Sequence, residues 1–256
     1  MRRILAIHAH PDDIETLAAG TLALLAANGH HITIATMTAG DCGSEEMTAA
    51  ETGQVRRREA AAAAAIIGAD YICADIGDLC VFNDDVSRRR TTELVRAARP
   101  DLVLTAAPAD YHPDHEATSM LVRDALFASS VPNYKTGAAA ALAAIPHLYF
   151  MDPIEGRDRS GLRIVPDFAV DVTPFFEKKR AMLAAHDSQR NWVLKQHGLD
   201  DYMGAMEKWT AKRGTQFAVT YAEGFRHYTG TPYPRTKLLQ ELVGSALLPA
   251  QGRASP

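Results

Sequence analysis

The sequence of 256 residues has few cysteines and no long apolar run. Its three cysteines are too few for a disulfide framework and show no CxxC spacing, so a disulfide-stabilised secreted domain is excluded. No stretch of 18 uncharged apolar residues is present, so no membrane span is expected. The amino-terminal apolar run is broken at His8, His10 and Asp12, which argues against a signal peptide and favours a cytoplasmic location.

A strong excess of either charge sign is also missing. The net charge is −4 and the isoelectric point is near 6.2. Nucleic acids and anionic membranes require a concentrated basic face, so we expect neither as a partner. Two arginine runs, at residues 56–58 and 88–90, fall on predicted helices, where a solvated face is the ordinary interpretation.

Apolar residues make up 47% of the chain and charged residues 23%, as in ordinary soluble globular proteins. This length suits a single α/β domain. We therefore expect one domain over residues 1–256. Its core spans about residues 1–130, and a lid and carboxyl-terminal part of the same domain span about residues 131–250.

The first half of the chain alternates short strands with longer helices. Such alternation predicts βαβ units and a Rossmann-like, doubly wound, mostly parallel sheet of the α/β class. The predicted strands are residues 4–8, 31–36, 71–73 and 102–105, and the predicted helices are residues 14–28, 49–67, 87–98 and 116–128.

The second half of the chain is harder to interpret. Residues 130–146 are rich in Ala, Gly and Pro and are predicted to form a mobile loop or lid. Strands are expected near residues 147–150 and 168–172, followed by a helix at 174–186. Residues 189–228 show no clean period, and we expect them to cover the active-site edge of the sheet.

Two similar histidine motifs follow predicted strands. One reads AHPDDIE (residues 9–15) and follows the first strand; the other reads DYHPDHE (residues 110–116) and follows the strand 102–105. In open α/β sheets, ligands bind at the carboxyl ends of the strands. The sequence therefore predicts that both motifs meet at one site.

The spacing within each motif supports a shared pocket. Proline is favoured at the first position of a helix, which predicts His10 and His112 as the N-cap residues. Residues three apart on a helix lie about one turn apart, so His10 can face the same pocket as Asp13, and His112 the same pocket as His115. Two imidazoles and two or three carboxylates gathered in this way outline a metal site.

Three of these groups would bind the ion, and the others have chemical tasks. Asp12 is suited to be the general base because it stands next to Asp13 and near the attacking water. His112, oriented by Asp114, is suited to stabilise the oxyanion and to protonate the leaving amine. The alternative is that the motifs only cap two helices. A repeat of the motif at two strand-to-helix junctions favours the metal site. His8, on the first strand, is interpreted as a core residue.

These motifs resemble those of the PIG-L/LmbE family of zinc-dependent deacetylases, and the similarity covers most of the chain. The family usually has AHPDDxE at the first motif. Further matches are TAGDCGS at residues 38–44, with Asp41 in place of the usual Glu, RRRE at 56–59, HDSQ at 186–189 and YAEGF at 221–225.

The resemblance implies roles for particular residues. His10, Asp13 and His115 match the zinc ligands, Asp12 the general base, His112 the acid that stabilises the oxyanion, and Asp114 its orienting carboxylate. Arg56 and Asp78 resemble the pair that holds the sugar hydroxyls in some members. For Arg56, a solvated surface charge is the alternative. His186 is interpreted as a residue behind the site or as a helix-end partner.

The expected activity is hydrolysis of the acetamide of an N-acetyl amino sugar or its conjugate. Zn²⁺ is the expected cofactor, and Fe²⁺, Co²⁺ and Mn²⁺ suit the same ligands. The substrate is therefore a small molecule, and several family members assemble into homo-oligomers. Two alternatives are a metal-dependent phosphoesterase and a non-catalytic sugar- or nucleotide-binding module. The first turn lacks GxGxxG, which disfavours a dinucleotide site.

Overall fold

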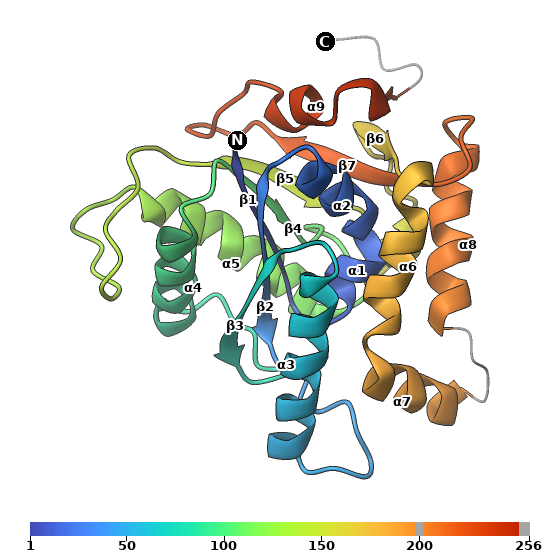
Figure 1. Ribbon diagram of the computed structural model, residues 1–256. Helices are drawn as coiled ribbons and strands as arrows, with labels where there is room; N and C mark the ends of the chain where they lie inside the picture. Colours follow the sequence, from blue (N-terminus) through green and yellow to red (C-terminus); the bar gives the residue numbers. More distant parts are fainter. Residues whose placement is uncertain (198–201, 251–256) are drawn as a thin grey trace.

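The computed structural model describes residues 1–197 and 202–250 (Figure 1). One sheet of eight strands runs through the molecule, with helices on both of its faces. The elements in chain order are β1 (Arg3–His8), α1 (Asp13–Leu17), α2 (Ala19–Ala27), β2 (His31–Thr38), α3 (Ala49–Ala65), β3 (Asp70–Ile76), α4 (Asp85–Ala98), β4 (Leu102–Thr105), α5 (Pro113–Ser129), β5 (His147–Met151), η1 (Ile154–Gly156), β6 (Phe168–Asp171), η2 (Thr173–Phe175), α6 (Phe176–Ala184), α7 (Asp187–His197), α8 (Tyr202–Thr215), β7 (Ala222–Tyr228), α9 (Leu238–Val243), η3 (Gly244–Ala246) and β8 (Leu247–Pro249).

The strand order is β3-β2-β1-β4-β5-β7-β6-β8. The first five strands in this order are parallel, and β7, β6 and β8 follow, each paired antiparallel with its neighbours. From β1 the chain first moves outward to β2 and β3, and then crosses to β4 on the other side of β1. This confirms the predicted Rossmann-like, mostly parallel α/β sheet. The reversal of direction between β1 and β4 makes their carboxyl ends the topological switch point, where such folds bind ligands.

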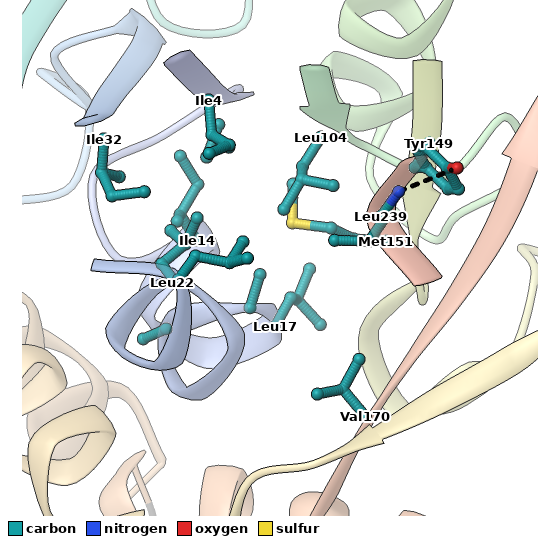
Figure 2. Packing of buried hydrophobic residues seen from close by; sticks show 14 of the residues in the cluster. Ile4, Ile14, Leu17, Leu22, Ile32, Leu104, Tyr149, Met151, Val170 and Leu239 are labelled. Carbon is teal, nitrogen blue, oxygen red and sulfur yellow. Dashed lines mark hydrogen bonds between the residues drawn. The ribbon is translucent and has the colours of Figure 1, made fainter. Parts of the chain in front are cut away.

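Alternate residues of β1 enter two different cores, because successive side chains of a strand point to opposite faces of the sheet. Ile4 and Ala6 pack with α1, α2 and α6, whereas Leu5 and Ile7 pack with α4 and α5. Figure 2 shows the first of these cores. In it, the Tyr149 hydroxyl accepts a hydrogen bond of 3.2 Å from the backbone N–H of Leu239, at the start of α9.

The predicted helix at residues 14–28 is wrong in one respect, because it is two helices. The break falls at Ala18, which has a φ of −143°. The carboxylate of Glu223, on β7, accepts hydrogen bonds of 2.9 Å from Gly20 N–H and 2.8 Å from Thr21 N–H. A group more than 200 positions away thus caps the second helix, and local sequence carries no sign of it.

Residues 130–146 were predicted to form a mobile loop or lid, and the structure shows a loop that is not a lid over the site. This segment returns from α5 to the start of β5, at the amino-terminal edge of the strands. Arg96 on α4 donates hydrogen bonds to the carbonyls of Ser129, Val131 and Tyr134, which fix the segment against the helix. Residues 143–146 line a surface cavity together with Arg2 and other residues that precede strands. The segment therefore lies away from the switch point.

The carboxyl-terminal part covers the end of the sheet where the parallel strands have their carboxyl ends, as the sequence predicted. Helices α6, α7 and α8 lie together on one side of the sheet, and the arrowheads of β2 and β3 point toward the end of the molecule where α7 lies (Figure 1). Within the described residues, the helices are all too short or too polar to cross a membrane.

Candidate functional site

The two histidine motifs meet at the switch point. The first follows β1 and the second follows β4, and these strands are parallel neighbours. The rings of His10 and His115 lie 5.3 Å apart between centroids, and those of His10 and His112 lie 4.8 Å apart. Residues more than 100 positions apart in sequence therefore share one pocket.

Asp13 lies at the centre of this cluster. Its Oδ2 lies 3.2 Å from Nδ1 of His10 and 2.7 Å from Nδ1 of His8, and its Oδ1 lies 3.2 Å from Nε2 of His115. Burial raises the pKa of the Asp13 carboxyl, but His115 and His8 outweigh it and hold that pKa well below its usual range. Asp13 is thus an anion that the histidine-rich surroundings stabilise.

His115 is buried and has carboxylates on both sides. Its Nδ1 lies 3.2 Å from Oδ2 of Asp110, which is fully buried, while its Nε2 faces Asp13. Burial disfavours the imidazolium, but Asp13 and Asp110 raise the pKa of His115 to about 9. Carboxylates that stabilise a proton on this ring also stabilise a metal cation in its place.

The donor set fits a divalent metal ion. His10, Asp13 and His115 would offer two imidazole nitrogens and a carboxylate oxygen, the ligand types of a catalytic zinc site. Asp110 behind His115 is the carboxylate partner that metal-binding histidines commonly have, because it fixes which ring nitrogen faces the ion. Nitrogen atoms of His10, His112 and His115 lie within 4.8 Å of one another.

Asp12 adjoins this cluster and has an unusual backbone. It is the N-cap residue of α1, with a φ of 93°, so the prediction of His10 as the N-cap is wrong. Its Oδ2 accepts a hydrogen bond of 2.8 Å from the hydroxyl of Tyr202 and lies 3.7 Å from Nη2 of Arg56. Burial raises the pKa of Asp12, although Arg56 opposes the shift. A raised pKa suits a carboxylate that must accept a proton near neutral pH.

His112 is the N-cap residue of α5, as predicted. Its Nδ1 accepts a hydrogen bond of 3.2 Å from the backbone N–H of Asp114. Burial lowers the pKa of His112, and the neighbouring His10 and His115 lower it further. The ring is therefore neutral at pH 7 and carries its proton on Nε2, which is the nitrogen left to donate a hydrogen bond.

The carboxylate of Asp114 does not lie where the sequence predicted. It accepts a hydrogen bond of 2.8 Å from Leu79 N–H and lies 3.4 Å from Nε2 of His10. His112 is instead oriented by the backbone N–H of Asp114, because its ring caps the helix. The predicted contact between the Asp114 carboxylate and His112 is wrong. Asp114 nevertheless lies in the cluster, as predicted.

The two predicted substrate-binding residues both line the pocket. Arg56 is only 4% exposed, which excludes the solvated surface alternative. Its guanidinium donates hydrogen bonds to the carbonyls of Gly40 and Pro11 and so ties together the loops after β1 and β2. Asp78 lies 3.1 Å from Nε2 of His10. Their contact with sugar hydroxyls stays a prediction.

His186 lies behind the pocket. It is fully buried, and its Nε2 lies 3.5 Å from Oε1 of Glu15, the last residue of the first motif. Burial lowers the pKa of His186, but Glu15 and Asp12 raise it above its usual value overall. His186 therefore faces the acidic underside of the site and is not a helix-end partner alone.

Three further residues belong to the site that the sequence did not reveal. His8, interpreted as a core residue, contacts Asp13, and Asp110 contacts His115. A buried polar ring requires a partner, which was the available signal for His8. Tyr202, which contacts Asp12, comes from a segment without clean periodicity, so no local signal existed for it.

The pocket above the cluster has a volume of about 610 Å³. Its floor is formed by the two motifs, and its wall by η1, α7 and α8. The fold and the site together define a Rossmann-like enzyme with a metal-assisted catalytic centre at the switch point.

Residues 5–126 match the PIG-L family, described as GlcNAc-PI de-N-acetylase. The chain is 30% identical to 1D-myo-inositol 2-acetamido-2-deoxy-alpha-D-glucopyranoside deacetylase of Nakamurella multipartita over 236 residues, which cover 73% of this chain and 79% of the relative. The chain belongs to the PIG-L family, a family of metal-dependent amide hydrolases.

Two other relatives differ in their named reactions. The 4-oxalmesaconate hydratase of Pseudomonas putida is 29% identical over 195 residues, 73% of this chain and 74% of the relative. The diacetylchitobiose deacetylase of Thermococcus kodakarensis is 26% identical over 246 residues, 90% of this chain and 84% of the relative. Neither a phosphoesterase nor a non-catalytic module is favoured by these relatives.

Among solved structures, GalB, the 4-carboxy-2-hydroxymuconate hydratase of Pseudomonas putida, is similar in fold. It has a TM-score of 0.75 and 26% sequence identity, and the match covers 92% of this chain and 98% of GalB. The sheet and its flanking helices therefore agree with this solved structure over nearly the whole chain.

Proposed function

We propose that the protein is a zinc-dependent N-deacetylase. It hydrolyses the acetamide of an N-acetyl amino sugar or its conjugate and releases acetate and a free amine. The observation that carries this proposal is the meeting of the two motifs around Asp13, with Asp12 and His112 beside the same pocket. The deacetylases among the relatives support the same reaction.

His10, Asp13 and His115 are the proposed ligands of the ion. Two imidazoles and one carboxylate suit zinc and leave a coordination position open. When bound, the ion supplies Lewis-acid activation of the attacking water and of the acetamide carbonyl. His8 and Asp110 hold Asp13 and His115 in place from behind.

Asp12 is the proposed general base. Its carboxylate lies beside Asp13 and is fixed by Tyr202 and Arg56, so it is positioned to take a proton from the water as the water attacks. Burial raises the pKa of Asp12, and a carboxylate with a raised pKa accepts a proton from water more readily.

His112 is the proposed oxyanion donor. Its neutral ring carries a proton on Nε2, which can donate a hydrogen bond to the developing oxyanion. The departing amine receives the proton that Asp12 takes from the water, because the neutral ring cannot give up its own proton without becoming an imidazolate. The predicted role of His112 as the acid would require a ring that is charged before the reaction begins.

A hydratase is the second candidate, because one relative and one similar structure carry that name. The compounds in those names are carboxylate anions, which need cationic partners in a pocket. Of the pocket-lining residues in the described part of the chain, Arg56 is the one Lys or Arg, and backbone carbonyls and Asp12 already occupy it. Apart from the histidines of the proposed metal centre, the remaining charged lining is acidic, which favours an uncharged substrate and therefore the deacetylase.

We place the reaction in the cytoplasm. The three cysteines are free thiols, and Cys42 and Cys80 are exposed, as suits a reducing compartment.

The test is an activity panel with the zinc-loaded protein. We expect acetate release from N-acetylglucosamine and its glycosides. We expect no hydration of unsaturated tricarboxylates, which is measured as a loss of their ultraviolet absorbance. Hydration without acetate release would replace the deacetylase with the second candidate.

A further inference from the structure

The pocket has two chemically different halves. The floor carries the charged motifs, whereas the wall above it, contributed by η1, α7 and α8, is largely apolar. This apolar wall consists of Ile154, Trp192, Val193, Met206 and Trp209. The chain contains two tryptophans, and both lie in this wall, on different helices. Figure 1 shows α6 and α8 side by side, with α7 below them in this view.

The ring of Trp209 is held rigidly. The guanidinium of Arg213 lies 4.8 Å from the centroid of that ring, and its Nε and Nη2 are fixed by Asp152 at 2.8 and 2.7 Å. A Cβ at Gly156 would lie only 2.3 Å from Cη2 of Trp209, so the loop backbone packs directly on the ring edge. A ring fixed before binding loses little conformational entropy when a ligand packs against it.

Glu155 occupies the same wall in a strained backbone conformation. Its φ of 55° lies in the left-handed region, which costs a non-glycine residue on the order of 1 kcal/mol. Its side chain is exposed and lines the pocket, and within residues 1–197 and 202–250 it has no hydrogen bond or ion pair. The strain thus presents an unpaired carboxylate to the pocket and serves no contact within the described fold.

We propose that Trp192, Trp209 and Glu155 form a distal subsite for a second, uncharged, hydroxylated ring joined to the acetamido sugar. The proposal rests on the deacetylase function and adds the part of the substrate that lies away from the reacting amide. Aromatic faces pack on the apolar C–H face of a sugar ring, and an unpaired carboxylate accepts hydrogen bonds from its hydroxyls.

Size and charge support this choice of ligand. A pocket of about 610 Å³ lies within the range of about 300–1,000 Å³ that encloses a ligand much larger than an acetamide. The free negative charge of Glu155 repels a carboxylate or phosphate on the second ring, and the lining described above contains no unoccupied Lys or Arg to offset that repulsion. The subsite therefore selects a neutral sugar conjugate over an anionic one.

The first experiment compares kcat/KM for acetate release from three compounds in the zinc-loaded protein. They are N-acetylglucosamine, N,N′-diacetylchitobiose, and N-acetylglucosamine linked to glucuronate. We expect Trp192→Ala to lower kcat/KM for the chitobiose about tenfold and Glu155→Gln about fivefold, from loss of stacking and of a charge-assisted hydrogen bond. Both should change the value for the monosaccharide less than twofold.

For the glucuronate compound, the expected change in kcat/KM has the opposite direction. Glu155→Gln should raise its kcat/KM, because the substitution removes a repulsive charge and little else. Glu241→Gln is the matched control, since this exposed carboxylate on α9 lies near the amino-terminal edge of the strands. It should leave all three values unchanged. Equal effects of the two subsite variants on mono- and disaccharide would overturn the subsite.

A binding measurement separates the subsite from the reaction. Both tryptophans of the chain lie in the wall, so chitobiose should change the tryptophan emission and bind more tightly than N-acetylglucosamine. Glu155→Gln should abolish most of that difference. If the disaccharide binds in this way but no acetate is released from any compound, the deacetylase proposal fails and the subsite stands. If disaccharide and monosaccharide bind equally, the subsite is wrong.

Discussion

Asp13 connects the two halves of the site. Its two carboxylate oxygens lie beside three imidazoles, from His8, His10 and His115. These contacts fix which ring nitrogen of each histidine faces Asp13. The neighbouring Asp12 shares none of these contacts and is held instead by Tyr202 and Arg56. Two adjacent aspartates thus have different surroundings and different proposed tasks.

Asp12→Asn should abolish most of the turnover and leave the metal in place. An amide keeps the size of the side chain but cannot accept the proton from water, so kcat should fall by about 100- to 10,000-fold. Acetate release and zinc content of the purified variant are the two measurements. Near-normal turnover in a metal-loaded variant would show that Asp12 is not the base.

Asp110→Asn should weaken metal binding. The carboxylate lies 3.2 Å from Nδ1 of His115 and fixes the ring, and loss of such partners typically lowers metal affinity about 10- to 100-fold. Competition with a chromogenic chelator measures the affinity. Asp70→Asn is the control, because Asp70 pairs with His31 at a similar 3.1 Å on the exposed surface. Equal affinities of the two variants would contradict the role given to Asp110.

At the residue scale, the sequence revealed the motif residues that gather in the pocket and missed the residues that hold them in place. His10, Asp13 and His115 were predictable because a repeated motif followed two parallel strands. His8 contacts Asp13 and Asp110 contacts His115, each pair within one strand-to-helix turn, and the sequence does not show that these side chains face each other. Tyr202 depends on how α8 folds back over the site, and no spacing in the sequence encodes that.

At the element scale, a buried ion pair joins α6 to the rest of the fold. Lys179 on α6 donates hydrogen bonds of 2.7 Å to Glu223 Oε1 and 2.7 Å to the carbonyl of Thr16 on α1. The same carboxylate caps α2 through Gly20 and Thr21. One pair of side chains thus ties α1, α2, α6 and β7 together beneath the site.

Lys179→Met should destabilise the protein strongly. The substitution leaves the Glu223 carboxylate buried without its cation, which typically costs about 3–5 kcal/mol of unfolding free energy. Urea unfolding measures the difference. Lys178→Met, at the exposed neighbouring position, is the matched control and should change the stability by less than about 0.5 kcal/mol. A small loss for Lys179→Met would mean that the pair contributes little to joining these elements.

Helices and strands were predictable where the local sequence pattern was strong. Their boundaries were not predictable where a residue distant in sequence determines them. The strands β1 and β4 are short apolar runs and β2 is rich in β-branched residues, which local sequence specifies. The division of α1 from α2 was not predictable, since Glu223 creates it from β7. Residues 130–146 have the composition of a mobile lid, but their position follows from the return to β5, and Arg96 fixes them there.

At the scale of the whole molecule, the sheet is continuous from β3 to β8 and carries both the motif strands and the strands of the second half. The pocket needs both parts, since its floor comes from the first half and its apolar wall from α7 and α8. We therefore predict that the chain folds as one domain.

One cooperative unfolding transition should follow. Tryptophan fluorescence reports the carboxyl-terminal helices, because both tryptophans lie there, whereas far-ultraviolet circular dichroism reports the whole chain. The two signals should give the same urea midpoint if the halves unfold together. A fluorescence midpoint clearly below the circular dichroism midpoint would indicate that α7 and α8 form a separate unit.

The most direct test is anomalous diffraction at the zinc edge from crystals grown with the metal. We predict a peak about 2.0–2.2 Å from a nitrogen of His10, an oxygen of Asp13 and Nε2 of His115, with Asp12 beside it but outside bonding distance. A zinc peak elsewhere, or one from which His115 or Asp13 is missing, would contradict the metal centre on which the proposed hydrolysis depends.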